Sequence, residues 1–318
     1  MKICVTGASG FIGKALCVQL LKEQYSVVAT VRNTKLPSLS AQKNLKISEI
    51  ANIDINSNWS EILSGINCII HCAARVHVIK ESEVDSLSIY RKINVEGTRN
   101  LAQQAFSAGV KRLIFLSSIK VNGENTNGSY FKHTDTPFPK DAYSISKWEA
   151  EQVLQEISKQ TGLEVVIVRV PLVYGKEVKG NFLHLLNIVA KGIPLPFSKV
   201  KNLRSFLGLD NLINFLIHCI HHPKASGQTF LLSDGEDIST CDLIKKLAKG
   251  MQKPSRLFPA PIFFLRFLSR ALSKSLEMDR ALNSLQIDSS FTFKFLGWKP
   301  TVSINEGLHK TVQWYLSR

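Results

Sequence analysis

The chain has 318 residues, of which 44% are hydrophobic and 20% are charged, values typical of a soluble globular protein. This length allows one large core or two lobes around a cleft. No apolar run reaches the ~18 residues of a membrane span, and the N-terminal MKICVTGASG lacks the charged and apolar regions of a signal peptide. We therefore expect a cytoplasmic protein without an integral membrane segment.

The formal net charge of the chain is +15 and its pI is about 9.6. The lysines are dispersed and no tight basic block stands beside an aromatic ladder, so the charge does not indicate a nucleic-acid-binding protein. It predicts a solvated basic surface, which would favour a phosphate-bearing substrate. The six cysteines form no CxxC pair, which favours buried reduced thiols over disulfides or a metal site.

Short apolar runs alternate with helical patterns through the first half of the chain. Apolar, β-rich runs predict strands at 2–6, 26–32, 68–74, 112–118 and 164–170. Helical patterns occur at 11–24, 89–109 and 144–162, and the last two end in a glycine, where a C-cap is expected. Because the strands are continuously apolar and alternate with helices, they predict a parallel sheet covered on both faces.

This pattern is typical of a Rossmann-type, doubly wound α/β fold, whose ligands bind at the carboxyl ends of the strands. After residue 171, helical segments and proline turns replace the regular alternation. We therefore divide the chain into a dinucleotide-binding domain over 1–170 and a smaller, mainly helical substrate-binding lobe over 171–318. We expect the two to be interleaved, because QTFLLSD (228–234) has the pattern of a further strand of the main sheet.

The first predicted strand leads into TGASGFIG, in which Gly7, Gly10 and Gly13 are spaced three apart before a helix. Glycines at such a turn let the backbone approach a pyrophosphate, and the N-terminal N–H groups of the following helix bind the anion. The motif lies in the strand–turn–helix context that it requires, so it predicts a dinucleotide site.

TGASGFIG, together with a downstream Tyr-x-x-x-Lys, resembles the extended short-chain dehydrogenase/reductases, in particular their nucleotide-sugar epimerase/dehydratase branch. The resemblance covers essentially the whole chain. It implies that HCAAR (71–75) is the segment at the fourth strand that runs past the bound cofactor. It also implies that INVEGT contains the family's buried asparagine. The cofactor-binding residues that it implies are Gly7, Gly10, Phe11, Ile12, Gly13, Ala73, Ala74, Asn94 and Pro171.

The segment after the second predicted strand bears on the choice of nicotinamide. Enzymes that use NAD place an acid there, whereas a 2′-phosphate requires cations. VVATVRNTK contains no acid but has Arg32 and Lys35, and it is similar to the same segment of NADPH-using dihydroflavonol reductases. We therefore expect NADP(H), with NAD(H) as the alternative. In IANID, Asn52 and Ile53 stand where the family usually places an aspartate against the adenine.

Tyr143 and Lys147 in DAYSISKWEAE lie one helical turn apart, so their side chains share a helix face. A tyrosine has a reference pKa of ~10, and a neighbouring cation lowers that pKa by favouring the phenolate. The resemblance implies that Tyr143 exchanges a proton with a sugar oxygen, that both Tyr143 and Lys147 bind the cofactor, and that Lys147 does so at the nicotinamide ribose. In FLSSIKVNGE, Ser118 matches the family serine that binds the reacting oxygen. Asn122 replaces the family's usual tyrosine, which we interpret as a difference in the substrate pocket.

The resemblance also suggests the substrate and the reaction. It implies that Asn181 and Arg204 bind the diphosphate of a nucleotide sugar, a role that suits a guanidinium. Ile119 and Lys120 stand where dehydratases carry an acidic pair, which argues against dehydration. Several segments are similar to the bacterial UDP-N-acetylquinovosamine dehydrogenase group. This similarity implies reduction of a UDP-4-keto-6-deoxy-N-acetylhexosamine at C4 for surface polysaccharide synthesis.

Two other functions compete with this reductase. One is a UDP-hexose 4-epimerase with tightly bound NAD; the other is a non-catalytic dinucleotide sensor, although such sensors typically lose the tyrosine or the lysine.

Many relatives dimerise through a helix bundle that includes the tyrosine-bearing helix, so we expect a homodimer. The apolar LFPAPIFFLRFLSRAL (257–272) has three interpretations: core of the second lobe, a substrate lid, or a membrane-surface contact.

Overall fold

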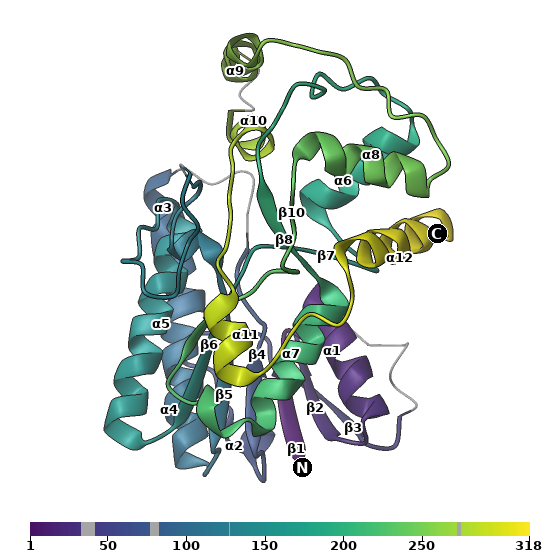
Figure 1. Cartoon of the computed structure of the whole chain (residues 1–318). Helices are drawn as coiled ribbons and strands as arrows, with labels where there is room; N and C mark the ends of the chain where they lie inside the picture. Colours follow the sequence, from purple (N-terminus) through teal and green to yellow (C-terminus); the bar gives the residue numbers. More distant parts are fainter. Residues whose placement is uncertain (33–41, 77–82, 127, 272–274) are drawn as a thin grey trace.

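The computed structural model describes residues 1–32, 42–76, 83–126, 128–271 and 275–318. In these residues the central sheet has seven strands, all parallel, in the order β3-β2-β1-β4-β5-β6-β9 (Figure 1). The strand order changes direction between β1 and β4, as in Rossmann folds. The strands are β1 (Lys2–Thr6), β2 (Ser26–Val31), β3 (Leu45–Glu49), β4 (Cys68–His71), β5 (Arg112–Ser118), β6 (Glu164–Val170) and β9 (Thr229–Leu231).

Helices cover both faces of this sheet, and each face has its own apolar core. Side chains alternate between the faces, so Ile3 and Val5 of β1 belong to one core and Cys4 belongs to the other. The helices on the first face are α1 (Phe11–Lys22), α7 (Leu209–His221) and α11 (Ser290–Leu296). Those on the second are α2 (Ser60–Leu63), α4 (Gly97–Ser107) and α5 (Ala142–Thr161), with α3 (Glu83–Tyr90) packed against α5.

The later part of the chain forms most of a second lobe above the carboxyl ends of the strands (Figure 1). It contains a small sheet in the order β10-β8-β7, made of β7 (Leu172–Tyr174), β8 (Arg204–Gly208) and β10 (Asp237–Ile238). Phe206 and Ile238 of this sheet share a core with three helices, α6 (Gly180–Ala190), α8 (Thr240–Gly250) and α12 (Ile304–Leu316). Two further helices, α9 (Ile262–Ala271) and α10 (Ser275–Leu282), extend from this lobe.

The predicted fold class is confirmed, and the differences lie in particular elements. The segment 89–109 is not one helix: α3 is followed by a π-helical turn, η1 (Arg91–Glu96), and then by α4. Strand β3 lies at the edge of the sheet with mostly exposed, polar side chains, so it has no apolar run to signal it. The expected strand at 228–234 is shorter, but it pairs with β6. The division into two domains stays a prediction.

A buried ion pair joins α5 to β6. Arg169 Nη2 lies 2.6 Å from Glu151 Oε2, and the two side chains are 4% and 0% exposed. Ser117 at the end of β5 donates its hydroxyl to Glu151, and Arg169 Nη1 donates to Asn122 Oδ1 at 2.9 Å. The charges are therefore neutralised inside the protein, and the network connects α5 with β5, with β6 and with the turn that follows β5.

Two short 3₁₀ turns, η2 (Ile119–Val121) and η3 (Pro223–Ala225), complete the described elements.

Replacing Arg169 by methionine leaves the carboxylate of Glu151 buried without its cation. We expect Arg169→Met to lower the free energy of unfolding by about 3–5 kcal/mol, since an unpaired buried charge has this cost. The double variant Glu151→Leu/Arg169→Met should recover most of this loss. Urea denaturation followed by circular dichroism measures both changes. The control is Arg91→Met, whose ion pair with Glu149 is more exposed and should change stability by about 1 kcal/mol or less.

Candidate active site

The predicted site residues come from successive strands and converge on one edge of the sheet. Gly7 follows β1, Ala73 follows β4, Ser118 ends β5 and Pro171 follows β6. Because these strands are parallel, all four positions lie at the same, carboxyl edge. Helix α5 adds Tyr143 in its first turn.

The glycine loop after β1 has the close approaches that the motif predicts. Gly7 has a φ of +68°, and a Cβ there would lie 2.9 Å from the backbone of Ala73. A Cβ on Gly13 would collide with the carbonyl oxygen of Gly7. Gly10 is the N-cap of α1 and no side chain caps the helix, so its first N–H groups have no side-chain acceptor at the cap and suit a phosphate. This geometry fits a dinucleotide.

The end of β4 is tied to β1 by a histidine that the sequence analysis did not single out. His71 is 1% exposed, and its two ring nitrogens hydrogen-bond to Thr6 Oγ1 at 2.6 Å and Thr98 Oγ1 at 3.1 Å. Burial lowers the pKa of His71 to about 3, with a contribution from the charge of Lys147, so the ring is neutral. The backbone N–H of Ala73 also donates to Thr6 Oγ1 at 3.2 Å. These bonds orient the backbone that faces the glycine loop.

Asn94 is buried, as the family resemblance implies, and it lies in the π-helical turn η1. Its Oδ1 accepts from the backbone N–H of Arg75 at 2.8 Å, and its Nδ2 donates to the carbonyl oxygen of Arg75 and to Ser146 Oγ. Asn94 therefore joins the segment after β4 to α5. A π-turn re-aims one side chain within a helix and is frequent at functional sites.

Lys147 is a buried cation, only 2% exposed. Its Nζ donates to the carbonyl oxygen of Leu116 at 2.8 Å and lies 4.3 Å from the centre of the Phe115 ring. Burial lowers the pKa of Lys147 to about 8, and the charge of Glu151 partly opposes this change. The ammonium group is thus attached to β5, one helical turn from Tyr143.

Tyr143 lies in the first turn of α5, after an N-terminal capping box formed by Asp141 and Ser144. Its ring meets the edge of the Tyr90 ring, with 6.2 Å between the ring centres. Burial and the nearby carboxylate of Asp141 raise the pKa of Tyr143, so without a cofactor the side chain is a neutral phenol. Ser118 ends β5, where its Oγ accepts from the backbone N–H of Lys120 at 3.3 Å.

The residues expected around the adenosine are only partly placed. Arg32 is exposed directly after β2 and forms no ion pair with the other described residues, whereas Lys35 lies outside the described residues. Asn52 is exposed after β3, and Ile53 packs against the core beneath α4. Phe11 and Ile12 begin α1 and are half-buried.

The expected diphosphate residues lie in the second lobe. Asn181 is exposed in the first turn of α6. Arg204 begins β8 and donates from Nη1 to the carbonyl oxygen of Asn283 at 2.9 Å. Burial and the neighbouring charge of Arg280 lower the pKa of Arg204 to about 10, and no described carboxylate forms an ion pair with it. Two cations at this place would favour an anionic ligand.

Asn122, which replaces the family's usual tyrosine, lies in the buried hydrogen-bond network of Arg169. It is 4% exposed, and its side chain bonds to Arg169 and to the carbonyl oxygen of Lys132. Asn122 thus belongs to the buried network of Arg169, and its interpretation as a difference in the substrate pocket stays a prediction. The i, i+4 spacing of Tyr143, Lys147 and Glu151 could have indicated that Glu151 belongs to the same helix face.

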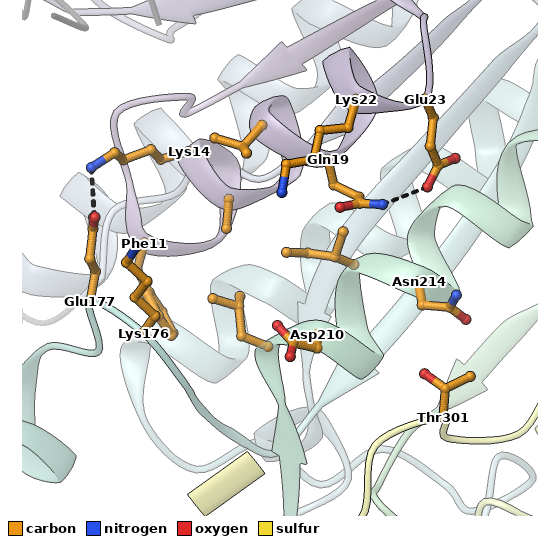
Figure 2. Close-up of a pocket in the computed structure, with 14 residues that line it drawn as sticks. Phe11, Lys14, Gln19, Lys22, Glu23, Lys176, Glu177, Asp210, Asn214 and Thr301 are labelled. Carbon is orange, nitrogen blue, oxygen red and sulfur yellow. Dashed lines mark hydrogen bonds and ion pairs between the residues drawn. The ribbon is translucent and has the colours of Figure 1, made fainter. Parts of the chain in front are cut away.

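A separate cavity of about 410 Å³ lies between α1 and α7, outside the cluster around Tyr143. Figure 2 shows Phe11 at one end of this cavity and Glu177 paired with Lys14. Gln19 and Glu23 also bond to each other at its rim. Two pairs of its polar side chains thus bind one another, and we assign no catalytic role to the cavity.

This fold and this cluster of residues define a dinucleotide-dependent oxidoreductase of the Rossmann type. The chain belongs to the NAD dependent epimerase/dehydratase family, whose model matches residues 3–233. It is therefore an enzyme of this family. The expected preference for NADP(H) gains no support here, since the family is described as NAD dependent.

Two relatives show where the chain lies within the family. A UDP-glucose 4-epimerase of Vibrio cholerae is 42% identical over 317 residues, which are 99% of this chain and 95% of that protein. An N-acetyl-alpha-D-glucosaminyl-diphospho-ditrans,octacis-undecaprenol 4-epimerase of Escherichia coli O157:H7 is 25% identical and covers 98% of this chain and 94% of its own length.

Solved structures share the fold over the whole chain. The UDP-glucuronic acid 4-epimerase from Bacillus cereus, in complex with UDP-glucuronic acid and NAD, has a TM-score of 0.82 at 24% identity and covers 100% of this chain and 99% of its own. A dTDP-glucose 4,6-dehydratase from Bacillus anthracis in complex with NAD has a TM-score of 0.78 at 19% identity, with coverage of 100% and 97%. At these identities the likeness shows the fold alone.

The lowered pKa of Lys147 predicts a pH-dependent contribution to stability. The folded pKa of about 8 lies below the ordinary value of 10.5, so between these values the unfolded chain binds more protons and stability rises with pH. We therefore expect the free energy of unfolding of the wild type, relative to Lys147→Met, to increase from about pH 8 to pH 10.5. Urea midpoints across this range measure it. Lys159→Met, at an exposed position of α5, is the control. Parallel curves for wild type and Lys147→Met would contradict the burial of the ammonium group.

Proposed function

We propose that the chain is a UDP-hexose 4-epimerase that keeps NAD bound. The observation that carries the proposed chemistry at C4 is the buried Lys147, which hydrogen-bonds to β5 one helical turn from Tyr143, at the strand end that carries Ser118. Its support among relatives is the UDP-glucose 4-epimerase of Vibrio cholerae, which matches nearly the whole chain. The glycine loop and the uncapped N-terminus of α1 would bind the diphosphate of the cofactor.

The chemistry that the chain supplies is proton transfer at the C4 oxygen of the sugar. When bound, the nicotinamide supplies hydride acceptance and return at C4. Tyr143 Oη takes the proton of the C4 hydroxyl and later gives it back. Because burial raises the pKa of Tyr143, the phenolate requires nearby positive charge, and Lys147 supplies part of it. Ser118 Oγ orients the same sugar oxygen by a hydrogen bond.

The nucleotide part of the substrate would lie in the second lobe. Arg204 has the charge and the burial to bind a diphosphate, and Arg280 adds a second positive charge nearby. Asn181 would donate an amide hydrogen to the same group. With the nucleotide bound in this way, epimerisation requires the sugar ring to present both faces of C4 to the cofactor.

A second candidate is favoured by one observation at the end of β2. The sequence from Arg32 to residue 41 contains no acid, and Arg32 is exposed there. This favours an exchangeable NADP(H), which suits a reductase of a UDP-4-keto-6-deoxy-N-acetylhexosamine. The proton step is the same, with Tyr143 giving its proton to the oxygen formed at C4. With either candidate, three points stay predictions: the division into a dinucleotide-binding domain and a substrate-binding lobe, the homodimer, and the role in surface polysaccharide synthesis.

One experiment separates the two candidates. Purified protein is denatured, released nicotinamide is quantified, and the native protein is incubated with UDP-glucose or UDP-N-acetylglucosamine. We expect bound NAD in near-equal amount to protein and interconversion with the C4 epimer, without net consumption of NADPH. Protein that is empty, leaves both UDP-hexoses unchanged and oxidises NADPH only with the 4-ketosugar would overturn the epimerase and establish the reductase.

Removing the hydroxyl of Tyr143 should abolish proton transfer without changing the fold. We expect Tyr143→Phe to lower kcat by about 10²–10⁴-fold, the usual contribution of a general acid–base group. Its nicotinamide content and thermal unfolding should match the wild type. Tyr25→Phe is the matched control, because Tyr25 precedes β2 at the opposite edge of the sheet. An active Tyr143→Phe enzyme would show that another group moves the proton.

A further inference from the structure

The outward face of α9 exposes a row of phenylalanines. Phe263 and Phe267 lie one helical turn apart and are 77% and 71% exposed, and Phe264 beside them is 50% exposed. Leu265 and Ser269 face the lobe instead and are almost fully buried. Most of the large apolar side chains of α9 therefore point to water and not into the lobe. Of the three interpretations of this segment, the core of the second lobe holds only for part of it, since Leu265 packs with Val200 and Leu282.

The sequence around α9 is basic, and the acids that follow it, Glu277 and Asp279, lie on α10, where Asp279 lines a cavity together with Arg266 and Arg270. Between residues 251 and 276 the sequence has no acidic residue, and its basic residues are Lys253, Arg256, Arg266, Arg270 and Lys274. With 3.6 residues per turn, Arg266 and Arg270 form a row directly beside that of Phe263 and Phe267. Arg266 donates to the side chain of Asn283, which follows α10, and both Arg266 and Arg270 are exposed.

The position of α9 in the molecule leaves this face accessible. Figure 1 shows α9 at the end of the molecule farthest from the amino ends of the central strands. A planar surface could therefore meet the phenylalanines without touching the sheet. No helix in the described part of the chain is long and apolar enough to cross a membrane, so contact with a bilayer would be at its surface.

We propose that Phe263, Phe264 and Phe267, flanked by Arg266 and Arg270, form a docking surface for an anionic lipid bilayer. Phenylalanines enter the boundary between headgroups and acyl chains, while arginines bind lipid phosphates. A second copy of the chain is the less suitable occupant. A two-fold contact through this face would bring the arginines of both copies together, whereas the neighbouring acids, Glu277 and Asp279, lie on α10 and not on the phenylalanine face of α9. This inference does not depend on the proposed reaction.

Flotation of the whole protein with vesicles tests the proposal. We expect it to float at low salt with vesicles of phosphatidylglycerol and phosphatidylcholine, and much less with phosphatidylcholine alone. Phe263→Ser/Phe267→Ser should weaken binding by about tenfold or more per side chain, since burying a phenylalanine contributes at least about 1.5 kcal/mol. Arg266→Gln/Arg270→Gln should weaken binding to the anionic vesicles by about fivefold per residue, from about 1 kcal/mol per basic side chain.

The matched control is Phe106→Ser on α4, which removes another exposed phenylalanine from a helix on the sheet. It should float like the wild type, and all variants should keep the wild-type thermal unfolding. Absence of wild-type flotation with anionic vesicles, or equal flotation of Phe263→Ser/Phe267→Ser, would overturn the proposal. If sedimentation velocity shows that this variant turns a dimer into a monomer while flotation is unchanged, the face is a contact between copies. Turnover of soluble substrate is measured separately, so failure of the reaction leaves this test intact.

Discussion

The burial of the Lys147 ammonium group against β5 is the interaction on which the site depends. Taking a cation out of water is costly, and three features offset that cost: the carbonyl oxygen of Leu116, the face of the Phe115 ring and the charge of Glu151. Glu151 is itself buried and paired with Arg169 of β6. The position of the lysine beside Tyr143 therefore depends on the packing of α5 against two strands.

The cofactor side of the site has the same kind of support. His71, Thr6 and Asn94 join the ends of β1 and β4 to α4 and α5 through buried hydrogen bonds. None of these three needs to touch a ligand to be important, because they determine how close the Ala73 backbone lies to the glycine loop. A rigid edge of this kind places a proton-transfer group and a hydride site with the small tolerance that catalysis requires.

The two candidate reactions share their chemistry at C4 and differ in what happens to the cofactor. An epimerase has to retain the cofactor until the hydride returns, whereas a reductase has to exchange it. The sequence signal that bears on NAD or NADP lies at the adenosine end, after β2. The relatives favour the epimerase, while the acid-free segment after Arg32 favours exchange of NADP(H). The catalytic residues alone are compatible with both.

The sequence by itself determined the elements whose signals are local. The glycine spacing after an apolar strand predicted the cofactor loop, and the spacing of Tyr143 and Lys147 predicted a shared helix face. Local patterns missed β3, because an exposed edge strand needs no apolar run, and they could not place Asn122, whose partner Arg169 is 47 residues away. The apolar residues of 257–272 left lobe core, substrate lid and membrane-surface contact open, and in the structure Phe263 and Phe267 are exposed. Whether a side chain is covered depends on segments distant in the sequence, so only the tertiary structure decided these points.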